Sequence, residues 1–360
     1  MTQSITRRRH IARRIPKTST AADGPSRARF WKRVLAIFVV ALLVRLAHLW
    51  QLQHSPFFSV LMGDSRGYDE WAQRLAAGDW IGRDVFYQAP LYPYLLGAIY
   101  ALFGRDLLVV RIVQAVLGSA ACVLLGLAGV RLFSPRVGLV TGLMLALYAP
   151  AIFLDALIQK SGLDIFLICV ALWLVSELSN RRAALAGWMA LGVTLGALSL
   201  TRENALVLVS VVLVWAVSIE RRVPEPKLAR RARFAGVVAL LLGLAIVLVP
   251  VAARNKLVGG GFYLTTSQFG PNFYIGNNPR ADGSYMSLRE GRGDPAYERQ
   301  DATELAEQAL GRRLTPAEVS LVWRDRALQF IASEPRNWLK LLGRKVLLLL
   351  NATEMLDTEA

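Results

Sequence analysis

The sequence has few of the residues that build disulfide or metal sites. Its two cysteines, Cys122 and Cys169, both fall inside apolar runs, and its three histidines, His10, His48 and His54, do not have metal-ligand spacing. A disulfide framework and a cysteine or histidine metal cluster are therefore excluded. We expect no cofactor and no metal among the site residues, and the sequence leaves a requirement for a divalent metal open.

Charged residues are also scarce, at 19% of the chain, whereas apolar residues make up 54% and occur in long runs. A run of roughly 20 apolar residues is long enough to cross the ~30 Å hydrocarbon layer of a membrane. Seven runs of about this length are expected to span, and a weaker eighth lies at 338–352. The seven runs cover 34–52, 107–132, 137–154, 160–178, 184–200, 204–219 and 234–253. The chain is therefore predicted to be an all-α polytopic membrane protein.

The apolar segment 88–104 is predicted not to cross, because of the distribution of charge. If it does not cross and the N-terminus is cytoplasmic, the cytoplasmic segments carry 20 Lys and Arg against four acids, a net charge of +16. These segments are 1–33, 131–136, 177–182 and 220–233. The whole chain also carries +16, so the rest is neutral, as the positive-inside rule expects. Segment 88–104 is then re-entrant or interfacial, and the protein resides in the cell inner membrane.

The same distribution argues against a nucleic-acid partner, because the excess basic charge lies in loops that set topology. Residues 1–33 are predicted to be a basic cytoplasmic tail that touches anionic membrane lipids. The charged lead is longer than 30 residues and no small-residue cleavage site follows the first span. A cleaved signal peptide is therefore not expected.

Four regions follow from this topology: the tail 1–33, the bundle 34–253 with an outer loop at 53–106, an outer domain at 254–337, and a terminal membrane or interfacial helix at 338–360. The outer domain is predicted to be a small α+β unit, with strands at 262–266 and 272–276. Thr315 and Glu318 form a capping-box pattern that opens a helix, which Pro335 ends.

The first outer loop carries a cluster of polar residues near the membrane surface. Charged groups close to the hydrocarbon layer are energetically unfavourable, so their presence indicates a function. On a helix over 64–77, the side chains of Asp64, Tyr68, Trp71 and Leu75 share one stripe. The structural interpretation makes Asp64 an N-cap residue and the aromatics interfacial anchors. The functional interpretation makes Asp64 a general base in a pocket shaped by the aromatics.

Basic residues gather at the outer ends of several spans. Lys160 lies between Asp155 and Asp164, and Arg202 precedes Glu203 in a short outer turn. Arg45 and Arg111 lie near the outer ends of their own spans. One interpretation is that each cation snorkels to the interface without further function. In another, Glu203 neutralises Arg202 in a structural pair. The alternative is that Lys160 and Arg202 bind a lipid phosphate beside Asp64.

A base beside a phosphate site suits one reaction class. A sugar on a polyprenyl phosphate leaves as that phosphate, which is already anionic and needs cations rather than a general acid. The acceptor hydroxyl needs a base, so a single Asp with Arg and Lys suffices for direct displacement with inversion.

These features resemble the GT-C superfamily of membrane glycosyltransferases, and in particular its bacterial branch related to dolichyl-phosphate-mannose protein mannosyltransferases and lipid A aminoarabinose transferase. The matching elements, in chain order, are Asp64 with Tyr68, Pro90-Leu91-Tyr92-Pro93, Thr201-Arg202, and the outer-domain segment from Asn272 to Tyr285. The resemblance covers about residues 34–354. It implies Asp64 as catalytic base, a polyprenyl-phosphate sugar donor, and a lipid, glycan or protein acceptor outside the membrane. Together, the resemblance and the charges at the span ends give the expected substrate contacts Tyr68, Asp69, Lys160, Arg202, Glu203, Asn277 and Asn278.

The sequence departs from the family pattern in two places. Relatives often carry a second acid directly after the catalytic Asp, where this chain has Ser65, and Asp69 or Glu70 is a possible substitute. The family usually continues into further membrane helices, so we expect a truncated or minimal member. Two other functions stay open: a flippase or transporter of a lipid-linked sugar, and a non-catalytic scaffold. Charges at one face and the lack of a repeat argue against transport.

Overall fold

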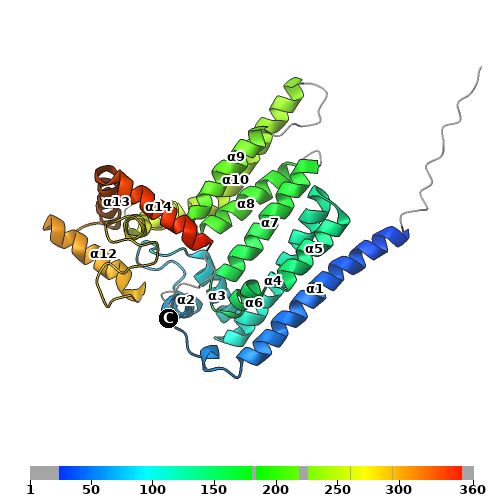
Figure 1. Ribbon diagram of the computed structural model, residues 1–360, viewed down its shortest axis with the longest axis horizontal. Helices are drawn as coiled ribbons and strands as arrows, with labels where there is room; N and C mark the ends of the chain where they lie inside the picture. The colour runs from blue at the N-terminus through cyan, green and yellow to red at the C-terminus, as the bar shows by residue number, and fades with distance from the viewer. Residues whose placement is uncertain (1–23, 181–183, 219–225, 260, 294, 351–360) are drawn as a thin grey trace, which may run out of the picture.

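The computed structural model describes residues 24–180, 184–218, 226–259, 261–293 and 295–350 of the chain. Residues 1–23 of the predicted basic tail and residues 351–360 lie outside this range. Figure 1 shows a bundle of long helices with smaller helices gathered at one of its ends. The bundle helices are α1 (Gly24–Leu52), α4 (Leu107–Leu132), α5 (Pro135–Ala146), α6 (Ala149–Ala156), α7 (Ser161–Asn180), α8 (Leu185–Ser199), α9 (Leu206–Ser218) and α10 (Pro226–Gly259).

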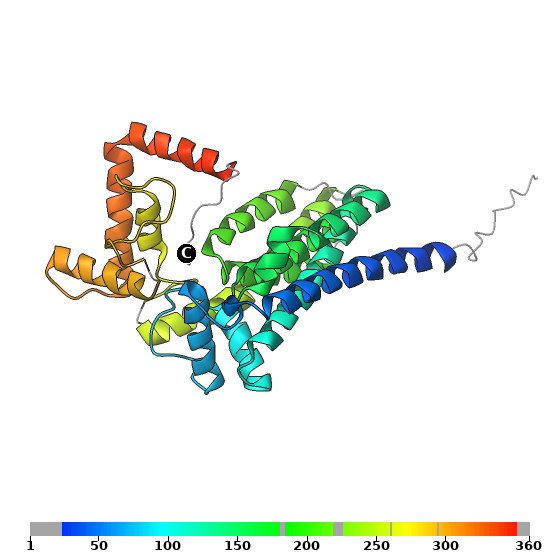
Figure 2. The same cartoon turned by 60° about the horizontal axis from the view of Figure 1, so that its bottom comes forward.

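The elements at the end of the bundle come from two separate parts of the chain. The first loop provides η1 (Pro56–Phe58), α2 (Gly63–Ala76) and α3 (Leu91–Phe103). The region after α10 provides α11 (Phe269–Gly276), α12 (Pro295–Leu310), α13 (Pro316–Ser333) and α14 (Pro335–Leu349). The N-terminal end of α1 lies at the opposite end of the bundle, as Figures 1 and 2 both show.

Four helices are long and apolar enough to cross a membrane: 30–52, 107–132, 161–179 and 227–259. The predicted span 137–154 is instead the pair α5 and α6, bent by 50°. Pro150 lies in the first turn of α6 and has no N–H to donate to the carbonyl of Ala146, the last residue of α5, which explains the break. Helices α8 and α9 are apolar but shorter, as is α3. The chain is therefore a multi-pass membrane protein.

A buried ion pair ties three bundle helices together. The Arg45 guanidinium on α1 donates from Nε to Asp155 Oδ2 on α6 at 2.7 Å, and the two side chains are 2% and 3% exposed. The pair packs directly on Gly118 of α4, where a Cβ would collide with the Asp155 carboxylate. Arg111, also on α4, donates to the Ala156 carbonyl and stacks over Phe58. Arg45, Arg111 and Asp155 are thus held by packing partners, so they are not snorkelling residues.

The outer end of α10 holds the first loop in place. Arg254 stacks on the Phe86 ring, with its guanidinium carbon 3.7 Å from the ring centroid, and donates to the backbone carbonyls of Ile81 and Asp84. Its neighbour Asn255 is fully buried, accepts from the Phe86 amide, and donates to the Thr265 carbonyl. One helix terminus therefore positions both the loop before α3 and the segment that leads to α11.

The prediction of an α+β outer domain is wrong, because the described residues contain no strand. Segment 272–276 belongs to helix α11, which packs on α13 so closely that Gly270 contacts the Ser320 backbone. Segment 262–266 is not helical, but its carbonyls accept from the Asn255 side chain and not from a neighbouring strand. Aromatic and β-branched residues suit a strand only where a partner strand exists. The domain is all-helical.

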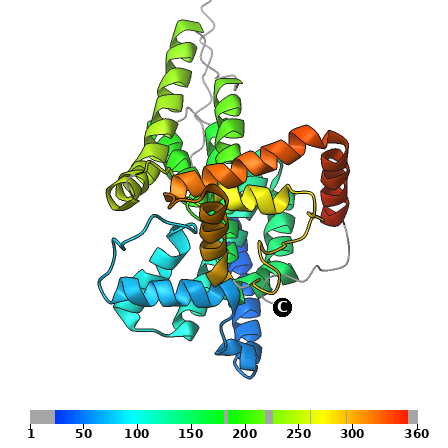
Figure 3. The ribbon, with the colours of Figure 1, turned by 90° about the vertical axis from the view of Figure 1, so that its left-hand side faces the viewer.

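Of two other outer elements, one matches the sequence prediction and one does not. The capping box forms, since Thr315 accepts from the Glu318 amide and Glu318 accepts from the Thr315 amide, and Glu334 ends α13 just before Pro335. Helix α14 includes Arg336, Lys340, Arg344 and Lys345 within 15 residues and is not among the helices apolar enough to cross. The eighth span is therefore not supported. Figure 3 shows α11 lying along α13, with α14 leaving the end of α13 at a steep angle.

Candidate active site

The carboxylate of Asp64 lies at the start of α2, where side chains hold it in place. Its Oδ1 accepts from the side-chain amide of Gln88 at 2.8 Å, and its Oδ2 lies 3.4 Å from the Tyr68 hydroxyl. The N-cap position of α2 is Met62, and no side chain caps the helix. The interpretation of Asp64 as an N-cap residue is therefore wrong, and its oxygens point to side chains of the loop instead.

Two turns of the bundle bring cations to this carboxylate. Lys160 lies in the turn between α6 and α7, and Arg202 lies in the turn between α8 and η2 (Glu203–Ala205). The second turn is joined to the first loop, because the Leu91 amide donates to the Leu200 carbonyl at 3.0 Å. This hydrogen bond joins the Pro90–Pro93 element, at the start of α3, to the turn that contains Thr201 and Arg202. Both segments are among the motifs on which the family resemblance rests.

The charges of these groups act on one another. Burial lowers the pKa of the Lys160 ammonium, and Arg202 adds to this, while the carboxylates of Asp64, Asp164 and Glu203 raise it. Burial also raises the pKa of Tyr68, with further contributions from Asp64. These residues come from three distant parts of the chain, and the fold brings them together. The sequence indicated only that they share the outer side of the membrane. We call Asp64, Tyr68, Gln88, Lys160, Arg202 and Glu203 the outer cluster.

Arg202 and Glu203 do not pair with each other. The Arg202 Nε donates to Asp164 Oδ2, and its Nη2 lies 3.3 Å from the Ser161 hydroxyl. The Glu203 carboxylate accepts instead from the Thr266 hydroxyl and from the side-chain amide of Gln268. The predicted structural pair is therefore wrong: Asp164 orients Arg202, whose Nη1 makes no hydrogen bond to the described residues. A guanidinium has five N–H donors, so this arrangement leaves donors for a ligand.

Lys160 is the second cation available to a ligand. Its side chain is half-buried, and its ammonium forms no hydrogen bond or ion pair with another residue in the described part of the chain. Polar groups in such places are usually satisfied, so an anion is the expected partner.

Three predicted substrate contacts lie elsewhere. Asp69 is buried and accepts from Arg105, Tyr100 and Gln73, so its oxygens are used within the first loop. The Asn277 and Asn278 amides donate to carbonyls of α11, and Asn277 also accepts from Trp338 of α14. In the described part of the chain, no hydrogen bond or ion pair joins these three side chains to the outer cluster.

Sequence reasoning missed two groups near Asp64. Gln88 directly holds the carboxylate but matches no motif. Glu298 on α12 accepts from the Tyr87 hydroxyl at 2.7 Å and from the Tyr285 hydroxyl at 3.2 Å. Burial raises the pKa of Glu298, and the charges of Asp64 and Glu203 raise it further. The outer domain thus places a second carboxyl group within electrostatic reach of Asp64, which only the folded chain reveals.

Part of the chain is similar to known proteins. Residues 87–252 match the family model described as dolichyl-phosphate-mannose-protein mannosyltransferase. The predicted resemblance is confirmed. The chain is also 30% identical, over 192 residues, to the undecaprenyl phosphate-alpha-4-amino-4-deoxy-L-arabinose arabinosyl transferase of Pseudomonas aeruginosa (strain UCBPP-PA14). That match covers 49% of this chain and 32% of the relative, so the chain aligns with about a third of the relative's length. No solved structure gives a significant match.

The region that matches the family model contains part of the outer cluster. It begins at Tyr87, next to Gln88, and contains both cation turns and α10 as far as Ala252. Asp64 precedes the region and the outer domain follows it. The Asp64 carboxylate can accept a proton, and Lys160 and Arg202 can neutralise an anionic leaving group, which are the two functions a phosphate-linked glycosyl transfer requires.

Proposed function

We propose that this protein transfers a sugar from a polyprenyl-phosphate donor to an acceptor hydroxyl, with Asp64 as the general base. The outer cluster supports this proposal most. In it, the Asp64 carboxylate is fixed by Gln88, and Lys160 and Arg202 have N–H donors that bond to no described residue. The likeness to glycosyltransferases supports the reaction class, and the printed name of the bacterial relative supports an undecaprenyl-phosphate donor.

The proposed step is a single displacement at the anomeric carbon. The acceptor oxygen forms a bond to this carbon while the bond from the carbon to the phosphate oxygen breaks. Asp64 takes the acceptor proton, and the electron pair of the broken bond leaves with the polyprenyl phosphate. Because the attack comes from the face opposite the leaving group, the configuration inverts.

Lys160 and Arg202 stabilise the charge that grows on the leaving phosphate. Charge-assisted hydrogen bonds to phosphate are about twice as strong as neutral ones. Asp164 and Ser161 fix the Arg202 guanidinium before the donor arrives, which lowers the cost of ordering it during the reaction. Gln88 fixes Asp64 in the same way.

We place this site on the periplasmic side of the inner membrane, with the N-terminus of the chain in the cytoplasm. The charge distribution of the loops supports this orientation. The helix ends that flank the basic loops lie together with the start of α1, at the far end of the bundle from α2 (Figure 1).

A donor panel tests the proposal. The purified protein in lipid nanodiscs is mixed with polyprenyl phosphates that carry different sugars, and with lipid, glycan and peptide acceptors. Release of polyprenyl phosphate from at least one donor is expected, and its loss in the Asp64→Asn variant. If the folded protein binds none of the donors, the donor class is wrong.

A further inference from the structure

The outer domain contains a cavity that the outer cluster does not use. It has a volume of about 280 Å³ and lies between α12 and α13, with part of the first loop on its third side. Its walls include Tyr87, Ser267, Arg299, Thr303, Glu307 and Arg313. A phosphate or a small sugar phosphate fits such a volume, which is near the lower limit of ~300 Å³ for ligand pockets.

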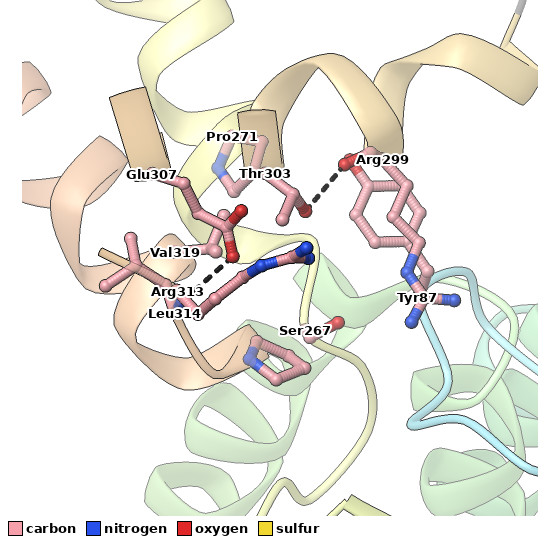
Figure 4. Close-up of a pocket in the computed structure, with 10 residues that line it drawn as sticks. Tyr87, Ser267, Pro271, Arg299, Thr303, Glu307, Arg313, Leu314 and Val319 are labelled. Carbon is pink, nitrogen blue, oxygen red and sulfur yellow. Dashed lines mark hydrogen bonds between the residues drawn. The ribbon is translucent and has the colours of Figure 1, made fainter. Parts of the chain in front are cut away.

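Two guanidinium groups give the cavity its charge. Figure 4 shows the Arg313 side chain reaching from one wall toward the middle, with Tyr87 and Arg299 on the opposite side. Within the described residues, the Arg313 side chain has no ion pair and no hydrogen bond, and Arg299 has only Asp84, at 3.5 Å from its Nη1. Several N–H donors on both sides of the cavity are therefore unused.

The acidic group in the cavity does not cancel this charge. Glu307 accepts from the Leu314 amide at 2.9 Å, which fixes the loop before α13, and it forms no ion pair with either arginine. Two cations face one carboxylate, so the net charge of the lining is positive. The hydroxyls of Thr303 and Ser267 lie in the same walls and add polar groups.

Tyr87 connects this cavity with the outer cluster. Its ring lines the cavity, its hydroxyl donates to Glu298, and the next residue, Gln88, holds Asp64. Glu298 and Arg299 are neighbours on α12, one directed to Tyr87 and Tyr285 and the other lining the cavity. Consecutive residues of the first loop therefore contact the cavity and the outer cluster, which makes the acceptor a suitable occupant of the cavity.

We propose that this cavity binds an oxyanion, a phosphate or carboxylate group carried by the acceptor. Planar guanidinium groups bind both anions in paired hydrogen bonds. The inference rests on the proposed function in identifying the ligand as the acceptor, whereas the oxyanion site itself does not. The acceptor is thus an anionic molecule, and Arg299 and Arg313 determine the specificity for it.

A binding experiment tests the oxyanion site without requiring transfer. Inorganic phosphate and D-glucuronate are titrated into the full protein and followed by calorimetry. The background variant is Arg202→Ala, which weakens the proposed donor site. Phosphate or glucuronate should still bind, and adding Arg313→Gln should weaken binding about tenfold, as expected for a lost hydrogen bond to a charged group. Arg324→Gln is the matched control, because Arg324 is an exposed residue of α13 that pairs with its neighbour Asp325.

The two variants in the cavity separate binding from folding. Arg299→Gln also removes the ion pair with Asp84 and can disturb folding, whereas the Arg313 side chain has no hydrogen bond or ion pair with a described residue to lose. If neither anion binds in the Arg202→Ala background, or if Arg313→Gln and the control bind equally well, the oxyanion site is wrong.

A kinetic experiment tests the link to the acceptor. With an acceptor that carries a phosphate or carboxylate, Arg313→Gln should raise the acceptor KM about tenfold and leave the donor KM unchanged. An unchanged acceptor KM overturns the assignment of the ligand. If transfer itself is absent, the proposed function fails, and the titration still decides whether the cavity binds an oxyanion.

Discussion

Replacement of Asp64 by asparagine tests the proposed general base most sharply. The amide keeps the shape of the carboxylate, and its oxygen can still accept from Gln88, which lies 2.8 Å from Oδ1 in the wild type. The other contact, with the Tyr68 hydroxyl, is long at 3.4 Å and contributes little. The loss of folding stability should therefore be at most about 1 kcal/mol.

The effect on catalysis should be much larger. General-base catalysis contributes about 10²- to 10⁴-fold, which corresponds to about 3–5 kcal/mol of the activation free energy. We expect the Asp64→Asn variant to lose sugar transfer by this factor while its donor affinity changes little, since Lys160 and Arg202 stay in place. The assay measures release of polyprenyl phosphate under single-turnover conditions, together with the thermal unfolding midpoint.

A matched control is available in the same loop. Asp79 accepts from the Gly82 amide and lies outside the outer cluster, so Asp79→Asn removes a carboxylate without touching the proposed base. Its transfer rate should stay close to that of the wild type. If Asp64→Asn keeps more than about a third of the wild-type rate, far above the loss expected for a general base, Asp64 is not the base.

Three further predictions follow from the structure. Arg202→Ala should weaken donor binding about tenfold and also slow turnover, measured by equilibrium binding and kcat, and unchanged values in a folded variant would leave the donor phosphate without a site. Cysteines introduced at 79–84 and at 104–106, in a background without Cys122 and Cys169, should label from the same outer side; labelling from opposite sides would show that 88–104 crosses. Arg45→Ala should lower stability by about 3–5 kcal/mol, because it leaves the buried Asp155 unpaired, and an unchanged unfolding midpoint would refute the importance of that pair.

Much of the bundle could be predicted from the sequence, because long apolar runs report directly on helices that are able to cross a membrane. Helix-start and helix-end residues also predicted the ends of helices outside the bundle correctly. Gly78 follows the end of α2 in a positive-φ conformation, and the Thr315 capping box opens α13 as expected. These features depend only on residues close together in the chain, so no knowledge of tertiary contacts is needed.

The failures came where distant contacts decide the structure. Segment 272–276 has strand-like composition, but its packing on α13 makes it helical. Asp164 takes the place expected of Glu203 beside Arg202, although it lies 38 residues away. Glu298 comes near Asp64 only because α12 folds back onto α2, and nothing in its local sequence indicates this.

The anomeric configuration of the product tests the proposed reaction most directly. The donor is a polyprenyl phosphate with a sugar of defined configuration and a carbon-13 label at its anomeric carbon, and the product is examined by NMR after transfer by the wild-type protein. Direct attack by an acceptor activated by Asp64 predicts the opposite configuration in the product. A product that keeps the donor's configuration would require two displacements and would contradict the single-step reaction.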